Sequence, residues 1–313
     1  MPLEKLQTYQ GRNPHPADFD EYWSRALNEL TGVNPDIELI PAKFQVKNAE
    51  CFDLYFTGTK GARIHAKYLR PKNAQNCPAV LQFHGYSGNA GDWQDKLSYV
   101  SQGFCVAAMD CRGQGGLSED TSNVRGNTHR GHIIRGLDDH PDNLLFRQIF
   151  LDTVQLAKIV MNFNEVDENR VGTMGNSQGG ALAIVCAALE PRIKRISSLH
   201  PFLSDYKRVW EMDLAKNAFE ELTTYFRLFD PLHEREDEIF TTLGYIDIQH
   251  LANRVKGEVL MGCGLMDTVC PPSIQFAMYN KLQSPKNVLI YPEYAHEGKP
   301  GFSDRTMQFM LGL

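Results

Sequence analysis

The segment Gly175-Asn176-Ser177-Gln178-Gly179 is the feature that most constrains how this chain can fold. A β-branched run at 170–174 precedes it, and a run of small and apolar residues at 180–189 follows it. Small residues allow the backbone to turn sharply from a strand into a helix, which leaves a serine hydroxyl exposed above the sheet. Many matches to this pattern are ordinary turns, but the flanking strand and helix favour Ser177 as a nucleophile.

Strand and helix patterns alternate on both sides of this turn, which predicts an α/β fold with a mostly parallel, twisted sheet flanked by helices. The predicted strands are 51–56, 63–69, 79–83, 104–109, 170–174, 193–199, 258–262 and 288–291, the first two antiparallel. The predicted helices are 14–30 with Asp18 as its cap, 92–102, 145–160, 181–189, a helix starting at 271–272, and 302–311.

The chain carries no repeat, low-complexity segment or Gly/Ser linker, so we expect one domain spanning 1–313. Residues 202–251 interrupt the alternation, because they are helical in pattern and rich in aromatics. An insertion at the carboxyl edge of a parallel sheet commonly caps a pocket, so we expect a lid or partial lid near the active site. The alternative is that these aromatics are simply core residues.

Composition excludes several classes of function. The chain has 313 residues and a formal net charge of −6, which leaves no basic footprint for nucleic acid and disfavours a polyanionic substrate. It shows no signal peptide pattern and no apolar run long enough to span a bilayer. Seven cysteines without a C-x-x-C pair indicate reduced core residues. We therefore expect a cytoplasmic protein with a neutral substrate.

A serine hydroxyl needs a histidine to accept its proton and a carboxylate to hold that histidine in the right tautomer. When the nucleophile lies in a turn of this kind, the acid and the histidine follow it in that order. Asp267 follows the strand predicted at 258–262, and His296 follows the last predicted strand. Asp205, beyond the previous strand, is a competing acid. We prefer Asp267 because it lies closer to the end of its strand.

The oxyanion that forms in acyl transfer needs two hydrogen-bond donors. The backbone N–H after the nucleophile normally supplies one, and a loop after an earlier strand supplies the other. In this chain these are the N–H groups of Gln178 and Tyr86, the latter in His84-Gly85-Tyr86-Ser87-Gly88. No metal or organic cofactor is expected.

Three segments together resemble the signatures of the acetyl xylan esterase and cephalosporin C deacetylase family of carbohydrate esterases. They are Arg112-Gly113-Gln114, Gly175-Asn176-Ser177-Gln178-Gly179-Gly180 and His296-Glu297. The segments 84–86, 163–168 and 264–267 also resemble that family, so the likeness extends over nearly the whole chain. The resemblance implies an α/β-hydrolase fold. It also implies Ser177, Asp267 and His296 as the catalytic triad, with Tyr86 and Gln178 forming the oxyanion hole.

The same resemblance implies roles for five further residues. Arg112, Gln114 and Glu297 are supporting residues, and we hypothesise that Arg112 pairs with Glu297 to brace the loop after the last strand. Phe202 and Val269 are implied to wall the acyl pocket. The resemblance also implies a homohexamer, a trimer of dimers with its active sites facing an inner cavity.

These features predict a serine esterase that removes acetyl groups from neutral substrates such as acetylated xylo-oligosaccharides and cephalosporin-type acetates. A broad carboxylesterase, a thioesterase or a peptidase on the same fold is the alternative, because fold and triad do not determine the acyl group. Outside the enzymes, the alternative is a catalytically silent binding protein.

Overall fold

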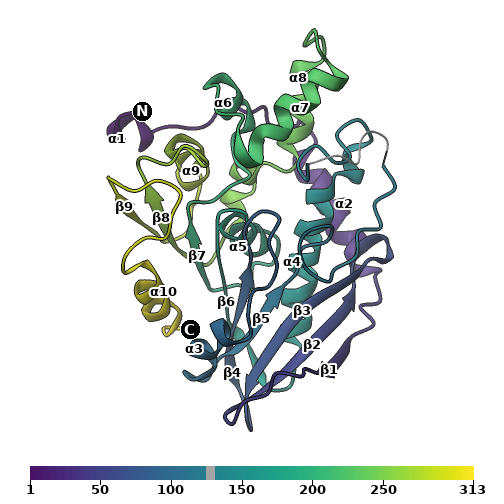
Figure 1. Ribbon diagram of the computed structural model, residues 1–313, viewed down its shortest axis with the longest axis vertical. Coiled ribbons are helices and arrows are strands. Elements are labelled where there is room, and N and C mark those ends of the chain that lie inside the picture. The colour runs from purple at the N-terminus through teal and green to yellow at the C-terminus, as the bar shows by residue number, and fades with distance from the viewer. Residues whose placement is uncertain (125–130) are drawn as a thin grey trace.

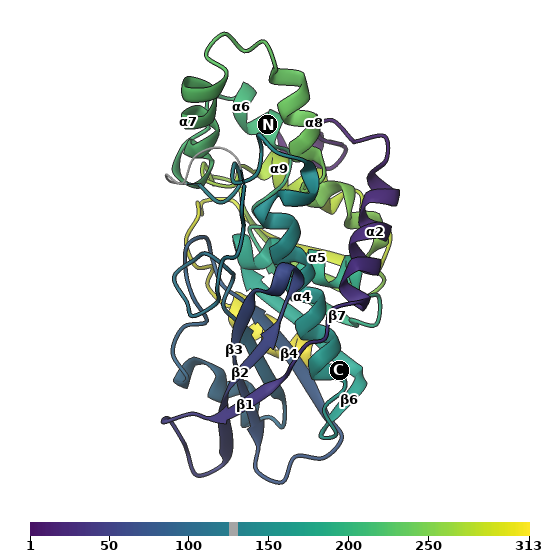
Figure 2. The same ribbon diagram turned by 90° about the vertical axis from the view of Figure 1, so that its right-hand side faces the viewer.

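The computed structural model describes residues 1–124 and 131–313. Its centre is a nine-stranded sheet in the order β1-β2-β3-β5-β4-β6-β7-β8-β9. Strands β4 to β9 pair in parallel, and β1, β2 and β3 join them antiparallel. Helices α4 and α5 lie on one face, and α3 and α10 lie on the other (Figures 1 and 2). The predicted mostly parallel sheet flanked by helices is confirmed.

All eight predicted strands are present, some longer and some shorter than expected, and one further strand, β1, lies at the sheet edge. The strands are β1 Glu38–Pro41, β2 Ala49–Thr57, β3 Arg63–Pro71, β4 Cys77–Phe83, β5 Cys105–Met109, β6 Val166–Asn176, β7 Arg195–Leu199, β8 Glu258–Gly264 and β9 Lys286–Tyr291. The sequence did not predict β1 because its four residues are mostly exposed and carry no alternating pattern.

The helices cover the sheet and its carboxyl edge. The α-helices are α1 Leu3–Leu6, α2 Phe19–Thr31, α3 Leu97–Val100, α4 Leu145–Met161, α5 Gln178–Leu189, α6 Tyr206–Glu211, α7 Glu220–Phe229, α8 Glu236–Gly244, α9 Pro272–Tyr279 and α10 Phe302–Met310. The 3-10 helices are η1 Thr59–Gly61, η2 Gln94–Lys96, η3 Pro141–Asn143, η4 Asn217–Phe219, η5 Ile248–His250 and η6 Ala252–Arg254.

Two predicted helices differ from those observed. The first begins only at Phe19, with Asp18 at the N-cap position as predicted. The Asp18 side chain does not cap the helix, because its carboxylate accepts a hydrogen bond from the hydroxyl of Tyr245. The helix predicted at 92–102 is reduced to η2 and α3. It ends in a Schellman arrangement around Gly103 (φ 87°), in which the Phe104 N–H donates back to the Tyr99 carbonyl.

Helix α5 is buried along its whole length, which explains its small and apolar sequence. It packs against β6 and β7, and its first turn follows the end of β6 directly. The carboxyl ends of the parallel strands therefore meet where α5 begins. Ligands commonly bind at such an edge in open α/β sheets.

Residues 202–251 contain α6, α7 and α8, which lie above the carboxyl edge of the sheet in Figures 1 and 2. Their apolar side, which includes Val209, Phe226 and Phe240, is buried. The single-domain reading and the role of this segment as a lid stay predictions.

Two further properties of the described residues concern the length of their helices and the state of their cysteines. None of the helices within 1–124 and 131–313 is long and apolar enough to cross a membrane. All seven cysteines are buried and carry free thiols.

Candidate active site

Ser177 lies at the turn between β6 and α5, with φ 55° and ψ −119°, a backbone conformation that L-residues rarely adopt. Its N–H donates to the Leu199 carbonyl at 2.9 Å. The glycines around it are required by close packing. A Cβ on Gly175 would overlap the backbone of Gly179, and one on Gly179 would overlap the carbonyl of Phe83. The chain thus holds a strained serine above the sheet because its neighbours lack side chains.

His296 and Asp267 complete a hydrogen-bonded series with this serine. His296 Nε2 lies 3.1 Å from Ser177 Oγ, and His296 Nδ1 lies 2.8 Å from Asp267 Oδ2. The other oxygen of Asp267 accepts the backbone N–H groups of Val269 (2.9 Å) and Cys270 (2.8 Å). The buried carboxylate is therefore fixed, and it favours the tautomer in which Nδ1 carries the proton and Nε2 can accept one from the serine.

The competing acid, Asp205, lies elsewhere. Its carboxylate accepts hydrogen bonds from the Tyr9 hydroxyl and from the backbone N–H groups of Arg12 and Asn13, each at 2.8 Å. Asp205 therefore anchors the N-terminal segment, and Asp267 is the acid that the structure brings to His296.

The Gln114 side chain connects the two segments that carry the predicted oxyanion donors. Gln178 is the first residue of α5, so no earlier helical carbonyl accepts its N–H. Tyr86 lies in the loop after β4. The Gln114 side chain accepts the N–H of Ser87 at 2.8 Å and pairs with the Gln178 side-chain amide at 2.9 Å. Gln114 thus ties the Tyr86 loop to the helix start, while the oxyanion role itself stays a prediction.

Both predicted pocket residues lie beside the triad. Phe202 is buried, its N–H donates to the Ser177 carbonyl at 3.2 Å, and its ring packs edge-on against Tyr86 at 5.7 Å. Val269 is half-buried and bonded to Asp267 through its N–H. Their role as the wall of an acyl pocket stays a prediction.

The predicted pair between Arg112 and Glu297 is wrong. Arg112 is completely buried, and its guanidinium makes a two-pronged contact with Asp152 on α4, at 2.7 and 2.6 Å. A third bond, of 3.2 Å, goes to the Thr59 carbonyl. Glu297 is exposed, and its carboxylate accepts the N–H of Ala295 at 3.0 Å. Arg112 faces α4 because a guanidinium removed from water needs a buried acidic partner. The sequence signal that could have identified this partner is Asp152 itself, an acid within a mostly apolar helix.

Lys299 braces the loop that carries His296. It is buried, and its ammonium donates to the carbonyls of Ala295 at 2.6 Å and Glu297 at 2.7 Å, one on each side of the histidine. Sequence reasoning missed this lysine, because nothing in its neighbourhood distinguishes it from a surface lysine.

His200, also missed, follows β7, and its ring packs at a tilt against that of His296. Burial, and then the proximity of His296, lowers the pKa of His200 to about 3, so it is neutral. Within the described ranges, one group of side chains has the donor types of a metal site: ligand atoms of His200, Asp267 and His296 lie within 4.8 Å of one another. A metal bound there would displace the hydrogen bond between Asp267 and His296, so these residues fit a Ser–His–Asp function better.

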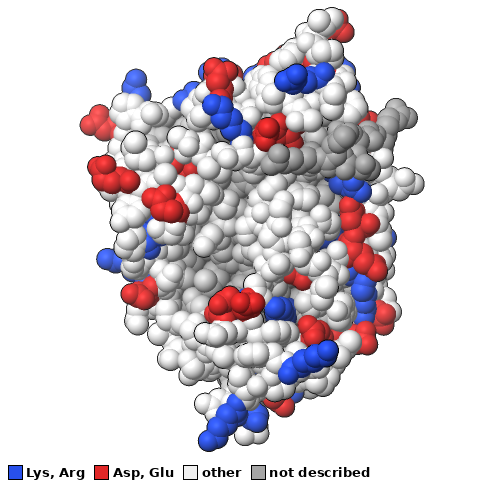
Figure 3. Space-filling view, in the orientation of Figure 1, with Lys and Arg blue, Asp and Glu red and all other residues white. Residues whose placement is uncertain are grey.

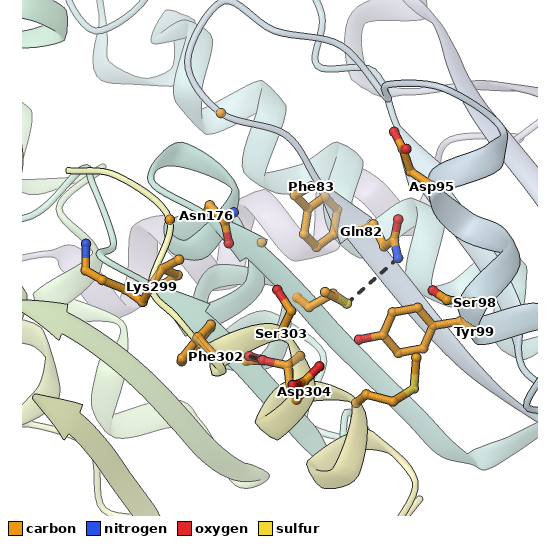
Figure 4. Close-up of a pocket in the computed structure, with 18 of the residues that line it drawn as sticks. Gln82, Phe83, Asp95, Ser98, Tyr99, Asn176, Lys299, Phe302, Ser303 and Asp304 are labelled. Atoms are coloured by element: carbon orange, nitrogen blue, oxygen red, sulfur yellow. Dashed lines mark hydrogen bonds between the residues drawn. The ribbon is translucent and has the colours of Figure 1, made fainter. Parts of the chain in front are cut away.

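A cavity of about 830 Å³ opens beside the serine turn on the sheet face between α3 and α10 (Figure 4). The central strands of a parallel sheet are usually covered on both faces, yet Gln82 of β4 and Met174 of β6 are partly exposed here. Ser177 does not line this cavity, so it adjoins the triad rather than containing it. Its other labelled lining residues are Phe83, Asp95, Ser98, Tyr99, Asn176, Lys299, Phe302, Ser303 and Asp304.

The parallel sheet, the strained serine between strand and helix, and the Ser–His–Asp series define an α/β-hydrolase. Solved structures agree: the chain superposes on Acetyl Xylan Esterase 1 from Thermoanaerobacterium sp. with a TM-score of 0.99 and 65% identity, covering 100% of this chain and 98% of that one. An acetyl xylan esterase from a Paenibacillus species gives a TM-score of 0.95 and 34% identity, covering 100% and 99%.

A family model described as acetyl xylan esterase (AXE1) matches residues 1–313, and the chain belongs to this family. The curated acetyl esterase Axe7A of Xylanibacter ruminicola is 27% identical over 290 residues, covering 90% of this chain. The chain spans 64% of the length of Axe7A. The acylaminoacyl peptidase of Pyrococcus horikoshii, at 18% identity and a TM-score of 0.55, shares the fold alone.

Proposed function

We propose that this protein is a serine esterase that removes acetyl groups from neutral, O-acetylated substrates. The observation that carries the proposal is the series from Ser177 Oγ through His296 to Asp267 in a member of the acetyl xylan esterase family. A neutral substrate is also favoured by the surface, because Lys and Arg are scattered among Asp and Glu on the face shown in Figure 3 rather than gathered into a patch.

In the proposed reaction, Ser177 Oγ attacks the acetyl carbonyl carbon while His296 Nε2 accepts the hydroxyl proton. The N–H groups of Gln178 and Tyr86 stabilise the oxyanion of the tetrahedral intermediate. Its collapse breaks the ester C–O bond, and His296 returns the proton to the departing oxygen, which leaves as an alcohol. Asp267 accepts the Nδ1–H bond throughout. Water, deprotonated by His296, then hydrolyses the acetyl-enzyme and releases acetate.

The finer substrate proposal is acetylated xylo-oligosaccharides and cephalosporin-type acetates. It is supported by the family and by the names of the two acetyl xylan esterases that superpose on the chain. We further propose a homohexamer, on the family resemblance, and a cytoplasmic location, which agrees with seven reduced cysteines.

The test is a kinetic panel with Ser177→Ala as the matched control. We expect acetate release from acetylated xylo-oligosaccharides and from an aryl acetate, and much slower turnover of thioester and amide analogues of equal size. Faster turnover of the amide or thioester would indicate the peptidase or thioesterase alternative. No release from any substrate, with no covalent serine adduct, would indicate a binding protein. Size-exclusion chromatography with light scattering tests the hexamer.

A further inference from the structure

Glu221 lies in the first turn of α7, within the segment above the sheet, and its carboxylate is buried against the loop after β4. One oxygen accepts a hydrogen bond from the Tyr86 hydroxyl, and the other accepts the N–H of Ile134 at 2.9 Å. The Glu221 carboxylate also lies close to the backbone of Gly131 (φ 141°), where an added Cβ would be 2.6 Å from Glu221 Oε2. The helical segment therefore reaches the active-site loop through this carboxylate.

The Tyr86 side chain is held on several sides. Its hydroxyl donates to Glu221 and accepts the N–H of His132 at 3.2 Å. Its ring packs edge-on against His132 at 4.8 Å and against Phe202 at 5.7 Å. Because a side chain fixed at its tip restrains its own backbone, these contacts restrain the Tyr86 backbone, including its N–H.

Burial raises the pKa of Glu221 to about 7, and the hydrogen bonds from Tyr86 and from backbone N–H groups oppose this rise. A carboxyl group is costly to bury for packing alone, since an apolar side chain of similar size would fill the space without desolvation. What a carboxylate supplies here is a strong acceptor aimed at a phenol hydroxyl.

We propose that Glu221 is a positioning residue for the oxyanion hole, holding Tyr86 so that its backbone N–H faces the developing oxyanion, and that α7 is thereby part of the catalytic apparatus. This inference rests on the proposed esterase function. Misplacing a donor by about 1 Å can cost on the order of a hundredfold in rate, so a residue that never touches substrate can control turnover.

Glu221→Gln keeps the shape of the side chain and weakens its acceptor. On an aryl acetate we expect kcat to fall about ten- to a hundredfold while KM changes less than about threefold, because the oxyanion forms only after binding. Inhibition by a methyl trifluoromethyl ketone, whose adduct with Ser177 carries an oxyanion, should weaken by the same factor as kcat/KM. Glu234→Gln, an exposed carboxylate of the same segment, is the matched control and should leave both values unchanged.

Tyr86→Phe removes the other end of the contact, and we expect a similar loss of kcat. Since the two residues act as a unit, the double variant should be no slower than the slower single variant, within about threefold. A merely structural role would lower the melting temperature without this kinetic pattern. If Glu221→Gln does not fold, Glu221→Asp and Tyr86→Phe carry the test.

Retention of kcat and of inhibitor affinity in Glu221→Gln, or in Tyr86→Phe, would overturn the inference. Independent, multiplying losses in the double variant would also overturn it. A wild-type protein that releases no acetate would refute the proposed function itself, whereas wild-type turnover with an unaffected Glu221→Gln refutes only the positioning role.

Discussion

The imidazole ring of His200 lies against that of His296, with ring centroids 4.1 Å apart and planes inclined by 36°. His200 is buried, and its pKa is lowered to about 3, first by desolvation and then by His296. It therefore stays neutral while His296 gains and loses a proton in the proposed reaction. A neutral ring restrains its neighbour without the repulsion that a second positive charge would bring.

His200 should make folding sensitive to acid. An unfolded histidine titrates near pH 6.5, so below that pH the unfolded chain binds a proton that buried His200 does not. The contribution of uncharged His200 to the free energy of unfolding is therefore fully present above about pH 6.5. It is lost as the pH falls toward 3, by about 1.4 kcal/mol per pH unit.

From pH 5.5 to 4.5 the free energy of unfolding of His200→Phe should therefore fall by about 1.3 kcal/mol less than that of wild type, measured by urea unfolding. The exposed His140→Gln serves as the control and should keep the wild-type slope. Equal slopes for wild type and His200→Phe would refute this account.

Ser177 should be the covalent nucleophile, because it lies in the strained turn and its Oγ is 3.1 Å from His296 Nε2. A fluorophosphonate should label it, with the adduct mapped by peptide mass spectrometry. Ser177→Ala should lose the label and lose about 10⁶-fold in kcat, as expected for a triad nucleophile. A label on another residue, or an active Ser177→Ala protein, contradicts the assignment.

Asp267→Asn should lower kcat by about 10⁴-fold, because an amide in place of the carboxylate favours the wrong tautomer of His296. Asp205→Asn is the matched comparison. It should instead lower the melting temperature, since Asp205 holds the backbone of Arg12 and Asn13. If Asp205→Asn is the crippled enzyme and Asp267→Asn is active, the acid is assigned wrongly.

Arg112→Met should destabilise the fold by about 3–5 kcal/mol, because it leaves the completely buried Asp152 without its partner. Urea unfolding measures this directly. Glu297→Gln should leave the free energy of unfolding within about 0.5 kcal/mol of wild type, because that carboxylate is exposed. A large loss from Glu297→Gln as well as from Arg112→Met would support the pairing that the structure rejects, and an undiminished stability of Arg112→Met would contradict the contact with Asp152.

Activity should fall steeply as the acyl chain grows. Phe202 is buried against Tyr86, and Val269 is tied to Asp267, so neither can yield easily to a longer acyl group. Overpacking a rigid wall costs about 1–3 kcal/mol. Measuring kcat/KM for aryl acetate, propionate, butyrate and octanoate decides the point, and an optimum at butyrate or longer would indicate a general carboxylesterase.

Much of the fold was predictable because its signals are local. Apolar runs bounded by turn residues predicted the parallel strands. The serine turn predicted the order Ser177, Asp267, His296, and these residues follow strands β6, β8 and β9. Boundaries were less predictable. Asp18 lies at the predicted N-cap position of α2, but its side chain makes no capping hydrogen bond because a tyrosine more than 200 residues away takes its carboxylate.

The sequence by itself determined the turn at Ser177, since Gly175 and Gly179 are the only kind of residue that fits there, and it determined the order of the triad. Tertiary structure alone decided that Arg112 meets Asp152, that Lys299 braces the His296 loop, that His200 covers His296 and that Glu221 reaches Tyr86. The reason is physical. Backbone conformation depends on neighbouring residues, whereas a buried charge or ring takes whichever partner the packing of distant segments brings within reach.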